Sequence, residues 1–496
     1  MIVDTDNVRL ALSAQTAASR KAEFGQFLTP SPIAHFMASL FRTGSSQTCR
    51  LLDPGAGIGT LSAAFLTRCV RGDLSFRRIA VDAFELDDRL LPHLHRTLES
   101  YHDQLPCLEI SVRGQDFIET AVAALEGNLF AESLPRYTHA ILNPPYKKMR
   151  SDSPHRLGLR RVGIETVNLY SAFVALALEL LEDGGQLVAI IPRSFCNGPY
   201  YRPFRDFILG RAALKHMHLF HARNKAFRDD NVLQENIIFY LERGAQQTSV
   251  VVSVSTDDSF NDLSSHIYPF SEIVFPNDSE RFIHVPTATG DDATAQASSL
   301  TSTLADLDVS VSTGPIVDFR MRPHLLQTPN ADAVPLLYPG HFTDTRLEWP
   351  KKDFRKPNAI ALNAETARWL YPKGFYTVVR RFSSKEEKKR IVASVVDPAA
   401  FPNAEWIGFE NHLNVFHCQR HGLTEDVAHG LAAFLNTRAL DTYFRSFNGH
   451  TQVNATDLRQ LHYPSYRLLA QLGNWMRKHP QAEADQVDEK VKAVTA

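Results

Sequence analysis

The first 240 residues alternate short apolar runs with helix-like segments, and this alternation restricts the fold more than any other feature. One helical pattern begins at Leu61, and another covers Leu169–Glu182 and is expected to end at Asp183-Gly184-Gly185. Chains that alternate in this way form βαβ units, whose strands lie side by side in one open parallel sheet. We therefore predict an α/β domain with an open, seven-stranded parallel sheet, made of Cys49–Asp53, Ile79–Glu85, Leu108–Phe117, Tyr137–Leu142, Gln186–Ile191, Leu214–His221 and Glu235–Leu241.

Charge is distributed unevenly along the 496 residues, although the formal net charge is only −2. Residues 252–310 contain ten acidic residues and one basic residue, whereas residues 346–390 contain thirteen basic and five acidic residues. The basic block is either a solvated face or a phosphate-binding surface. Because the length exceeds that of one ordinary domain, we predict a first domain at 1–250, an acidic Ser/Thr-rich connector at 251–310, a mixed α+β domain at 311–478 and a polar tail at 479–496 that frays or forms an exposed helix.

Cysteine spacing and hydropathy exclude several classes of protein. The five cysteines are scattered, with no Cys-x-x-Cys pair and no Cys/His cluster of zinc spacing, so we expect neither disulfides nor a metal. The longest apolar helical run, Ala172–Leu181, is interrupted by Glu179 and is too short to span a membrane. With a polar N-terminus that lacks a signal pattern, the sequence predicts a soluble intracellular protein.

A glycine-rich stretch, Asp53-Pro54-Gly55-Ala56-Gly57-Ile58-Gly59-Thr60, follows the first expected strand and opens a helix. Glycines there allow a sharp turn and a close approach of the backbone to a ligand. The spacing G-x-G-x-G differs from the dinucleotide pattern G-x-G-x-x-G, so an adenosyl ligand fits better than NAD. A purely structural tight turn is the alternative.

Two carboxylates follow the next two expected strands. Glu85 lies where an acid binds the hydroxyls of a ribose in doubly wound folds, and Asp116, followed by Phe117, could accept a hydrogen bond from an adenine amino group. Either carboxylate alone could be an ordinary surface acid. Because the carboxyl ends of parallel strands meet at one edge of a sheet, we expect both to lie beside the glycine loop.

The fourth expected strand ends in Asn143-Pro144-Pro145-Tyr146. An exocyclic aromatic amine is a poor nucleophile because its lone pair is delocalised into the ring. The Asn143 side-chain oxygen and a proline carbonyl could each accept one N–H and so localise that lone pair on nitrogen. Prolines fix the direction of the carbonyl and have no N–H that competes, and Tyr146 offers a ring on which a planar base can stack. The alternative is a turn without chemistry.

In combination, these motifs resemble the S-adenosylmethionine-dependent DNA adenine-N6 methyltransferases, in the group with the cofactor motif first, the catalytic motif second and the target-recognition domain last. The resemblance covers nearly the whole chain and implies the Rossmann-like seven-stranded methyltransferase sheet, with a C-terminal mixed α+β target-recognition domain. It assigns methionine binding to Asp53–Thr60, ribose binding to Glu85, adenine binding to Asp116 and catalysis to Asn143–Tyr146. Upstream, Phe24–Pro30 resembles this group's additional cofactor motif, in which Phe27 and Thr29 would line the cofactor.

Downstream, Asn224–Arg228 lies where the family places an aromatic residue that stacks on the flipped base, so Phe227 is the candidate, with a core phenylalanine as the alternative. Phrases in the C-terminal half, including Val311–Arg320 and Phe409–Phe416, are similar to modification methylases of the PstI/BsuBI type. That similarity suggests the palindrome CTGCAG as target, methylated on its adenine.

The candidate DNA contacts are basic side chains suited to phosphates and amides or hydroxyls suited to base edges. The second group could equally be an ordinary polar loop, and two lysines after the catalytic motif could simply be solvated. The candidates are Lys147, Lys148, Arg380, Arg381, Lys385, Lys388, Lys389, Arg390, Asn448, His450, Thr451, Gln452 and Asn454.

The sequence therefore predicts a site-specific enzyme that methylates an adenine flipped out of double-stranded DNA, in the cytoplasm of a bacterium and associated with its nucleoid. We expect the enzyme to be the modification enzyme of a type II restriction–modification system. Its cognate restriction endonuclease would be a separate polypeptide that does not contact it. Two alternatives stay open: an RNA or protein-glutamine methyltransferase, since Asn-Pro-Pro-Tyr also serves those enzymes, and a non-catalytic DNA-binding specificity protein with an inherited cofactor fold.

Overall fold

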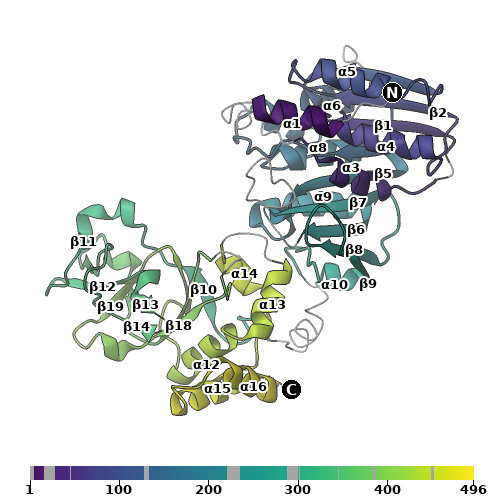
Figure 1. Cartoon of the computed structure of the whole chain (residues 1–496). Helices are drawn as coiled ribbons and strands as arrows, with labels where there is room; N and C mark the ends of the chain where they lie inside the picture. Colours follow the sequence, from purple (N-terminus) through teal and green to yellow (C-terminus); the bar gives the residue numbers. More distant parts are fainter. Residues whose placement is uncertain are drawn as a thin grey trace. The chain divides into compact units, whose positions relative to one another are not determined.

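The computed structural model describes residues 5–15, 28–44, 46–127, 133–220, 235–276, 278–286, 300, 302–343, 346–383, 387–447 and 452–495. The chain divides into two compact units, Met1–Val285 and Pro286–Ala496. Figure 1 shows the elements of each unit, coloured along the sequence. Six of the candidate site residues named from the sequence lie outside the described residues: Phe27, Phe227, Lys385, Asn448, His450 and Thr451.

The first unit is built on a nine-stranded sheet with the order β3-β2-β1-β4-β5-β7-β6-β8-β9. All seven expected strands are present, and β8 and β9 extend the sheet beyond them. The strands are β1 Thr48–Pro54, β2 Arg78–Phe84, β3 Leu108–Arg113, β4 Tyr137–Leu142, β5 Leu181–Pro192, β6 Ala212–Phe220, β7 Asn236–Arg243, β8 Val250–Ser255 and β9 Ser264–Tyr268.

The sheet is mixed, which corrects the expectation of a parallel one. The strands from β3 to β5 are parallel to their neighbours, whereas β7 is antiparallel to both β5 and β6. Antiparallel strands, unlike parallel ones, can pair without a helical crossover between them. Residues 251–310, expected as a connector between domains, also differ from that expectation at their start. There β8 pairs with β6 and β9 pairs with β8, so both strands belong to the sheet of the first unit.

Helices cover both faces of this sheet, as βαβ crossovers require. One buried apolar cluster contains residues of α3, α4 and α5, and the other contains residues of α6, α8 and α9 (Figure 1). Helix α8 ends at Leu180, so Asp183-Gly184-Gly185 belongs to the start of β5 rather than to the helix end. The helices are α1 Thr5–Gln15, α3 Ser31–Ser39, α4 Thr60–Arg71, α5 Leu91–Glu99, α6 Phe117–Leu125, α7 Pro154–Arg161, α8 Leu169–Leu180, α9 Arg202–Arg211 and α10 Phe270–Ile273.

The second unit is the expected α+β mixture. Its strands form the sheets β10-β20-β17-β18, β11-β15-β12-β19-β16 and β13-β14. They are β10 Ser310–Thr313, β11 Leu325–Leu326, β12 Ala333–Leu337, β13 Phe342–Thr343, β14 Arg346–Leu347, β15 Ala359–Ala361, β16 Tyr371–Pro372, β17 Tyr376–Arg380, β18 Ala393–Val396, β19 Trp406–Phe409 and β20 Leu413–His417. The helices follow: α12 Glu425–Leu435, α13 Arg438–Phe447, α14 Ala455–Arg459, α15 Tyr466–Lys478 and α16 Ala484–Thr495.

The C-terminal segment forms a helix, which is one of the two outcomes expected for it. Helix α16 buries Val487 and Val491 and contacts α15, so its apolar face is covered. Among the described residues, no helix is both long and apolar enough to cross a membrane, and no group of three or more potential metal ligands was found. The five cysteines are unpaired with one another.

Candidate active site

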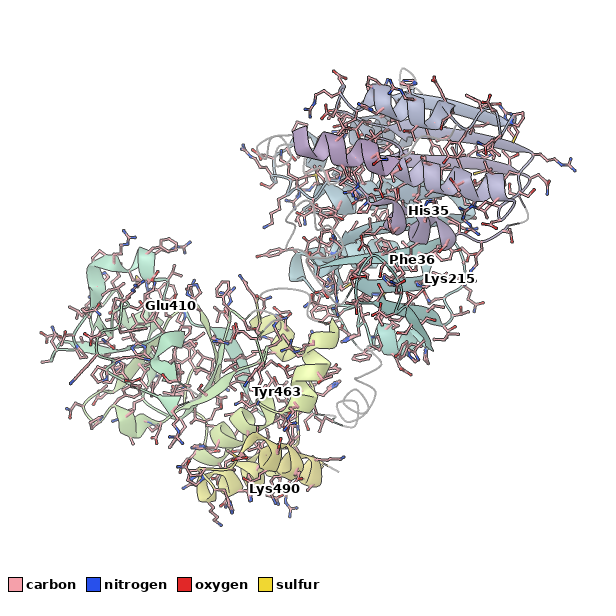
Figure 2. All side chains as sticks on the ribbon, in the orientation of Figure 1. His35, Phe36, Lys215, Glu410, Tyr463 and Lys490 are labelled. Carbon is pink, nitrogen blue, oxygen red and sulfur yellow. The ribbon has the colours of Figure 1, made fainter. Side chains whose placement is uncertain are left out.

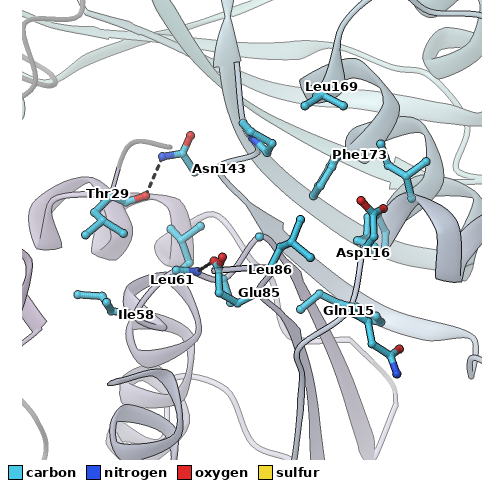
Figure 3. Close-up of a pocket in the computed structure, with 18 of the residues that line it drawn as sticks. Thr29, Ile58, Leu61, Glu85, Leu86, Gln115, Asp116, Asn143, Leu169 and Phe173 are labelled. Carbon is cyan, nitrogen blue, oxygen red and sulfur yellow. Dashed lines mark hydrogen bonds between the residues drawn. The ribbon is translucent and has the colours of Figure 1, made fainter. Parts of the chain in front are cut away.

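A cavity of about 320 Å³ opens where the carboxyl ends of the central strands meet (Figure 3). This is the edge at which open α/β sheets bind ligands. Its walls bring together the glycine loop, the two strand-end carboxylates and the asparagine of the Asn-Pro-Pro-Tyr motif. The lining residues are Leu28, Thr29, Gly55, Ala56, Gly57, Ile58, Thr60, Leu61, Phe84, Glu85, Leu86, Gln115, Asp116, Phe117, Ile118, Asn143, Pro145, Lys147, His155, Leu169 and Phe173.

The glycine loop is held in shape by the neighbouring strand. The backbone N–H groups of Gly55 and Ala56 both donate to the Phe84 carbonyl oxygen at 2.8 Å. Gly57 adopts a φ of +61°, and a Cβ added to it would lie 2.9 Å from Leu28 Cδ2. A side chain at Gly57 would therefore be strained by its backbone and crowded by Leu28.

Glu85 is buried and bonds to the loop itself. Its Oε2 accepts the N–H of Gly57 at 2.8 Å, and its Oε1 accepts the N–H of Asp87 at 2.7 Å. Burial raises the pKa of Glu85, while these backbone hydrogen bonds oppose the shift. A carboxylate in this position lines the cavity beside the loop, and carboxylate oxygens are acceptors of the kind that ribose hydroxyls require.

Asp53 lies behind the loop rather than in the cavity wall. It is fully buried; its Oδ2 accepts the Ser62 hydroxyl at 2.6 Å, and its Oδ1 has no hydrogen-bond partner among the described residues. Burial raises the pKa of Asp53 to about 7, against the effect of the Ser62 hydrogen bonds. The pKa of a buried carboxyl with one unsatisfied oxygen falls strongly when a cation is brought near it.

Asp116 lies at the start of α6 and contacts a residue that the sequence did not indicate. Its Oδ1 accepts the N–H of Glu119 at 3.0 Å and so caps the helix. Its Oδ2 lies 3.1 Å from Nε2 of His155, on α7. Burial would raise the pKa of Asp116, but His155 and the backbone N–H groups hold it below its usual value, and Asp116 in turn raises the pKa of His155.

Asn143 follows β4 directly, and two hydrogen bonds fix its amide. Nδ2 donates to the Thr29 hydroxyl at 3.0 Å, and the Tyr146 hydroxyl donates to Oδ1 at 3.0 Å. Figure 3 shows the bond between Thr29 and Asn143. The two residues lie 114 positions apart, so the fold brings the N-terminal motif against the Asn-Pro-Pro-Tyr motif. With Nδ2 bound to Thr29, Oδ1 is the acceptor presented to a ligand.

Tyr146 is half-buried beside a second tyrosine. Its ring meets Tyr170 edge-on, with 6.1 Å between centroids. Its hydroxyl also lies 3.3 Å from the Ile190 carbonyl oxygen. Burial raises the pKa of Tyr146, so the phenol stays neutral near pH 7. Pro145 lines the cavity between Asn143 and this ring, whereas Pro144 is buried.

The described candidates for DNA contacts fall into two groups. Lys147, which lines the cavity, and Lys148 are exposed in the first unit, and Lys388 is exposed in the second. The others bond within the second unit: Arg380 with Glu387, Arg381 with Asn411 and Gln452, and Lys389 with the Asn436 carbonyl oxygen.

Two further candidates for DNA contacts, Arg390 and Asn454, have contacts that give them structural roles. Arg390 is fully buried, with Nε 3.1 Å from the Ser383 hydroxyl and its guanidinium over the Phe444 ring. Such a side chain stabilises the domain core, and its placement does not fit a phosphate contact. Asn454 caps α14 in a capping box with Asp457. The Asn-x-x-Asp pattern is a recognisable signal for that role.

The fold and the cavity define an α/β protein with a preformed ligand site at the strand ends. Comparisons narrow this class. The family model described as "Eco57I restriction-modification methylase" matches residues 115–227. The chain is 50% identical to the type II methyltransferase M.BsuBI of Bacillus subtilis, over 94% of this chain and 92% of that protein. It is 40% identical to M.PstI of Providencia stuartii, over 95% and 92% respectively.

The chain therefore belongs to the type II methyltransferases of restriction–modification systems. Two solved structures share its fold. The DrdV–DNA complex gives a TM-score of 0.51 at 13% identity, covering 96% of this chain and 60% of that one. The type IIL restriction-modification enzyme MmeI in complex with DNA also gives 0.51, at 9% identity, covering 90% and 70%.

Proposed function

We propose that this protein transfers a methyl group from S-adenosylmethionine to the N6 amino group of an adenine flipped out of double-stranded DNA. One observation supports this most directly: the glycine loop, Glu85, Asp116 and Asn143 line the same cavity. Duplex DNA is proposed as substrate because the family consists of restriction–modification methyltransferases and because two structures of like fold are described as DNA complexes.

The residues present fit S-adenosylmethionine. Glu85 would bind the ribose hydroxyls, Asp116 would accept from the adenine amino group, and Phe117, Ile118 and Leu86 supply an apolar wall for the ring. The buried Asp53 would offset positive charge behind the loop. When bound, the cofactor supplies a methyl group activated by its attachment to a sulfonium.

Asn143 would prepare the target amine. Its Oδ1 accepts one N–H of the amine in place of the Tyr146 hydroxyl, and the Pro144 carbonyl accepts the other. Both interactions localise the nitrogen lone pair and strengthen as positive charge develops on nitrogen during methyl transfer. The proton then lost from nitrogen passes to water. Tyr146 stacks on the base, and we propose Phe227 for its other face.

The substrate class can be tested by measuring incorporation of a labelled methyl group into duplex DNA, transfer RNA and a peptide-release factor in parallel. Labelled DNA alone is expected. Label in transfer RNA or in the release factor, with none in DNA, would favour the corresponding alternative. Binding of S-adenosylmethionine without incorporation into any of the three would favour a specificity protein without catalysis.

The recognition sequence and the system around the enzyme are also proposals. CTGCAG is proposed as the target because M.PstI and M.BsuBI are relatives of high identity. A separate restriction endonuclease and a bacterial cytoplasmic location would follow from a restriction–modification role. Long-read sequencing of DNA from a methylation-free host that expresses this chain would report the modified base and its sequence context together.

A further inference from the structure

In the second unit, the buried carboxylate of Glu410 is bonded to a single half-exposed histidine. The side chain of Glu410 has 0% of its surface exposed and that of His412 has 42% (Glu410 is labelled in Figure 2). Glu410 Oε2 accepts the backbone N–H of His412 at 2.9 Å, and Oε1 lies 2.5 Å from His412 Nδ1. Burying a carboxylate is unfavourable unless its hydrogen bonds are satisfied. Here those bonds fix the orientation of one imidazole.

The turn that contains this pair is anchored by backbone hydrogen bonds to two other segments of the unit. It joins β19 to β20, and the N–H of Glu410 donates to the Leu337 carbonyl oxygen at 3.0 Å. The N–H of Asn411 donates to the Ile316 carbonyl oxygen at 2.9 Å. An imidazole held in this way has little conformational entropy to lose on binding a ligand. With Nδ1 against Glu410, Nε2 is the ring atom for which the described residues provide no hydrogen bond.

Side chains from distant parts of the chain surround His412. Arg381 donates to the Asn411 carbonyl oxygen at 2.9 Å and to Gln452 Oε1 at 3.3 Å, so it joins the turn to the segment before α14. The ring of Phe382, 44% exposed, lies 5.0 Å from the His412 ring. We call this surface, made of Arg381, Phe382, His412 and Gln452, the His412 face.

The chemistry of the His412 face suits a nucleic-acid base. An imidazole and an amide hydrogen-bond to base edges, a guanidinium contacts phosphate or guanine, and an exposed aromatic ring packs against a base or a thymine methyl. The other carboxylate that faces His412, Asp318, is paired with Lys356 Nζ at 2.6 Å. Its charge is therefore offset, which reduces repulsion of a polyanion at this face.

We propose that His412 reads one base edge of the target DNA through Nε2 and that Glu410 is the positioning residue that holds it. This inference rests on the proposed function and names a specificity-determining residue for it. Duplex DNA is the partner because the family methylates within restriction–modification systems and because two residues of the His412 face, Arg381 and Phe382, belong to the basic block at 346–390. A protein partner for this face is an outcome that the experiment distinguishes.

The test uses the full-length enzyme and duplexes that differ from the wild-type target by one base pair at each position. The target itself is first mapped by long-read sequencing. For each variant, the ratio of kcat/KM on the mapped target to that on each altered duplex is measured. This ratio does not depend on the fraction of folded enzyme, because both duplexes are assayed with the same preparation.

His412→Ala is expected to lower discrimination at one base pair, and at its symmetry mate in a palindrome, by about 5- to 100-fold. Glu410→Gln is expected to lower discrimination at the same position by less. The matched control is His421→Ala, an exposed histidine of the same unit whose Nδ1 contacts the Gln419 carbonyl oxygen. Its ratios should equal those of the wild type.

Three results would overturn the assignment. Unchanged discrimination at every position in His412→Ala would remove His412 from base readout and leave the face for a protein partner. An equal loss on all duplexes would indicate a phosphate contact or a structural role. A wild-type enzyme that binds S-adenosylmethionine but methylates no DNA would overturn the proposed function itself, which is a different observation from either of these.

Discussion

At the scale of single residues, the site depends on acceptor atoms whose direction is set by a neighbouring side chain or backbone N–H. Thr29 fixes the Asn143 amide, the Gly57 N–H orients Glu85, and His155 with the Glu119 N–H orients Asp116. Preorganised acceptors of this kind need no reorientation as charge develops, which is how polar groups accelerate a reaction without a strong base.

Thr29→Val tests the bond that orients Asn143. The variant removes the hydroxyl that accepts from Nδ2 and keeps the shape of the side chain. Since a neutral hydrogen bond contributes about 1 kcal/mol, we expect kcat to fall about 5- to 10-fold, with little change in the Kd of S-adenosylmethionine measured by calorimetry. Thr67→Val, which alters a helix hydroxyl bonded to Ala63 and Tyr101, is the control. A wild-type kcat in Thr29→Val would contradict this role.

Because the carboxyl of Asp53 is buried beside the glycine loop, we expect cofactor binding to depend on pH. Its pKa is about 7 without ligand because the carboxyl is buried. The cationic cofactor favours the ionised form, so binding should lower this pKa and release a proton below pH 7. We expect the affinity for S-adenosylmethionine to rise as the pH increases from about 5.5 to 7.5. The calorimetric enthalpy should depend on the buffer's ionisation enthalpy, and Asp53→Asn should abolish both effects. A wild-type affinity that is flat across this range would contradict the prediction.

At the scale of elements, the pair of His155 and Asp116 ties α7 to the start of α6. The pKa of His155 is raised and that of Asp116 is lowered. The histidine's contribution to stability is lost as the pH rises through its raised pKa, and the aspartate's is lost as the pH falls through its lowered one. The pair therefore stabilises the fold most between the ordinary pKa values of Asp and His, about 3.9 and 6.5.

His155→Gln should accordingly destabilise the first unit by about 0.5–1 kcal/mol near pH 5.5 and by less at pH 8.5. Urea unfolding of the wild type and the variant at both pH values measures this difference. His95→Gln, whose ring lies 4.0 Å from Glu99 on the exposed side of α5, is a control in which a smaller change is expected. A destabilisation of His155→Gln that grows at pH 8.5 would contradict the account.

The sequence predicted the elements better than the contacts between them. Apolar runs and glycines are local signals, so the seven strands and the loop at Asp53–Thr60 could be recognised before the structure. The bond from Asn143 to Thr29 and the pair of His155 and Asp116 join distant segments that no local pattern connects. Likewise, Arg390 belongs to a basic run, and only its tertiary neighbours Ser383, Asp441 and Phe444 reveal that it is a core residue.

At the scale of the whole molecule, each of the two units has its own task in the proposed function. The first holds the cofactor cavity and the Asn143 motif, and the second holds the His412 face. A substitution that impairs the function of one unit should therefore leave the function of the other unit intact and measurable. Asn143→Ala should abolish methyl transfer while leaving S-adenosylmethionine and DNA binding within a few-fold of the wild type, and His412→Ala should change sequence preference while leaving cofactor binding unchanged.

The most direct test of the central claim is mass-spectrometric analysis of nucleosides from the DNA of a methylation-free host that expresses the wild type or Asn143→Ala. The account predicts N6-methyladenine with the wild type and none with the variant, provided that the purified variant still binds S-adenosylmethionine. Methylated cytosine in place of N6-methyladenine, or undiminished N6-methyladenine with Asn143→Ala, would contradict it.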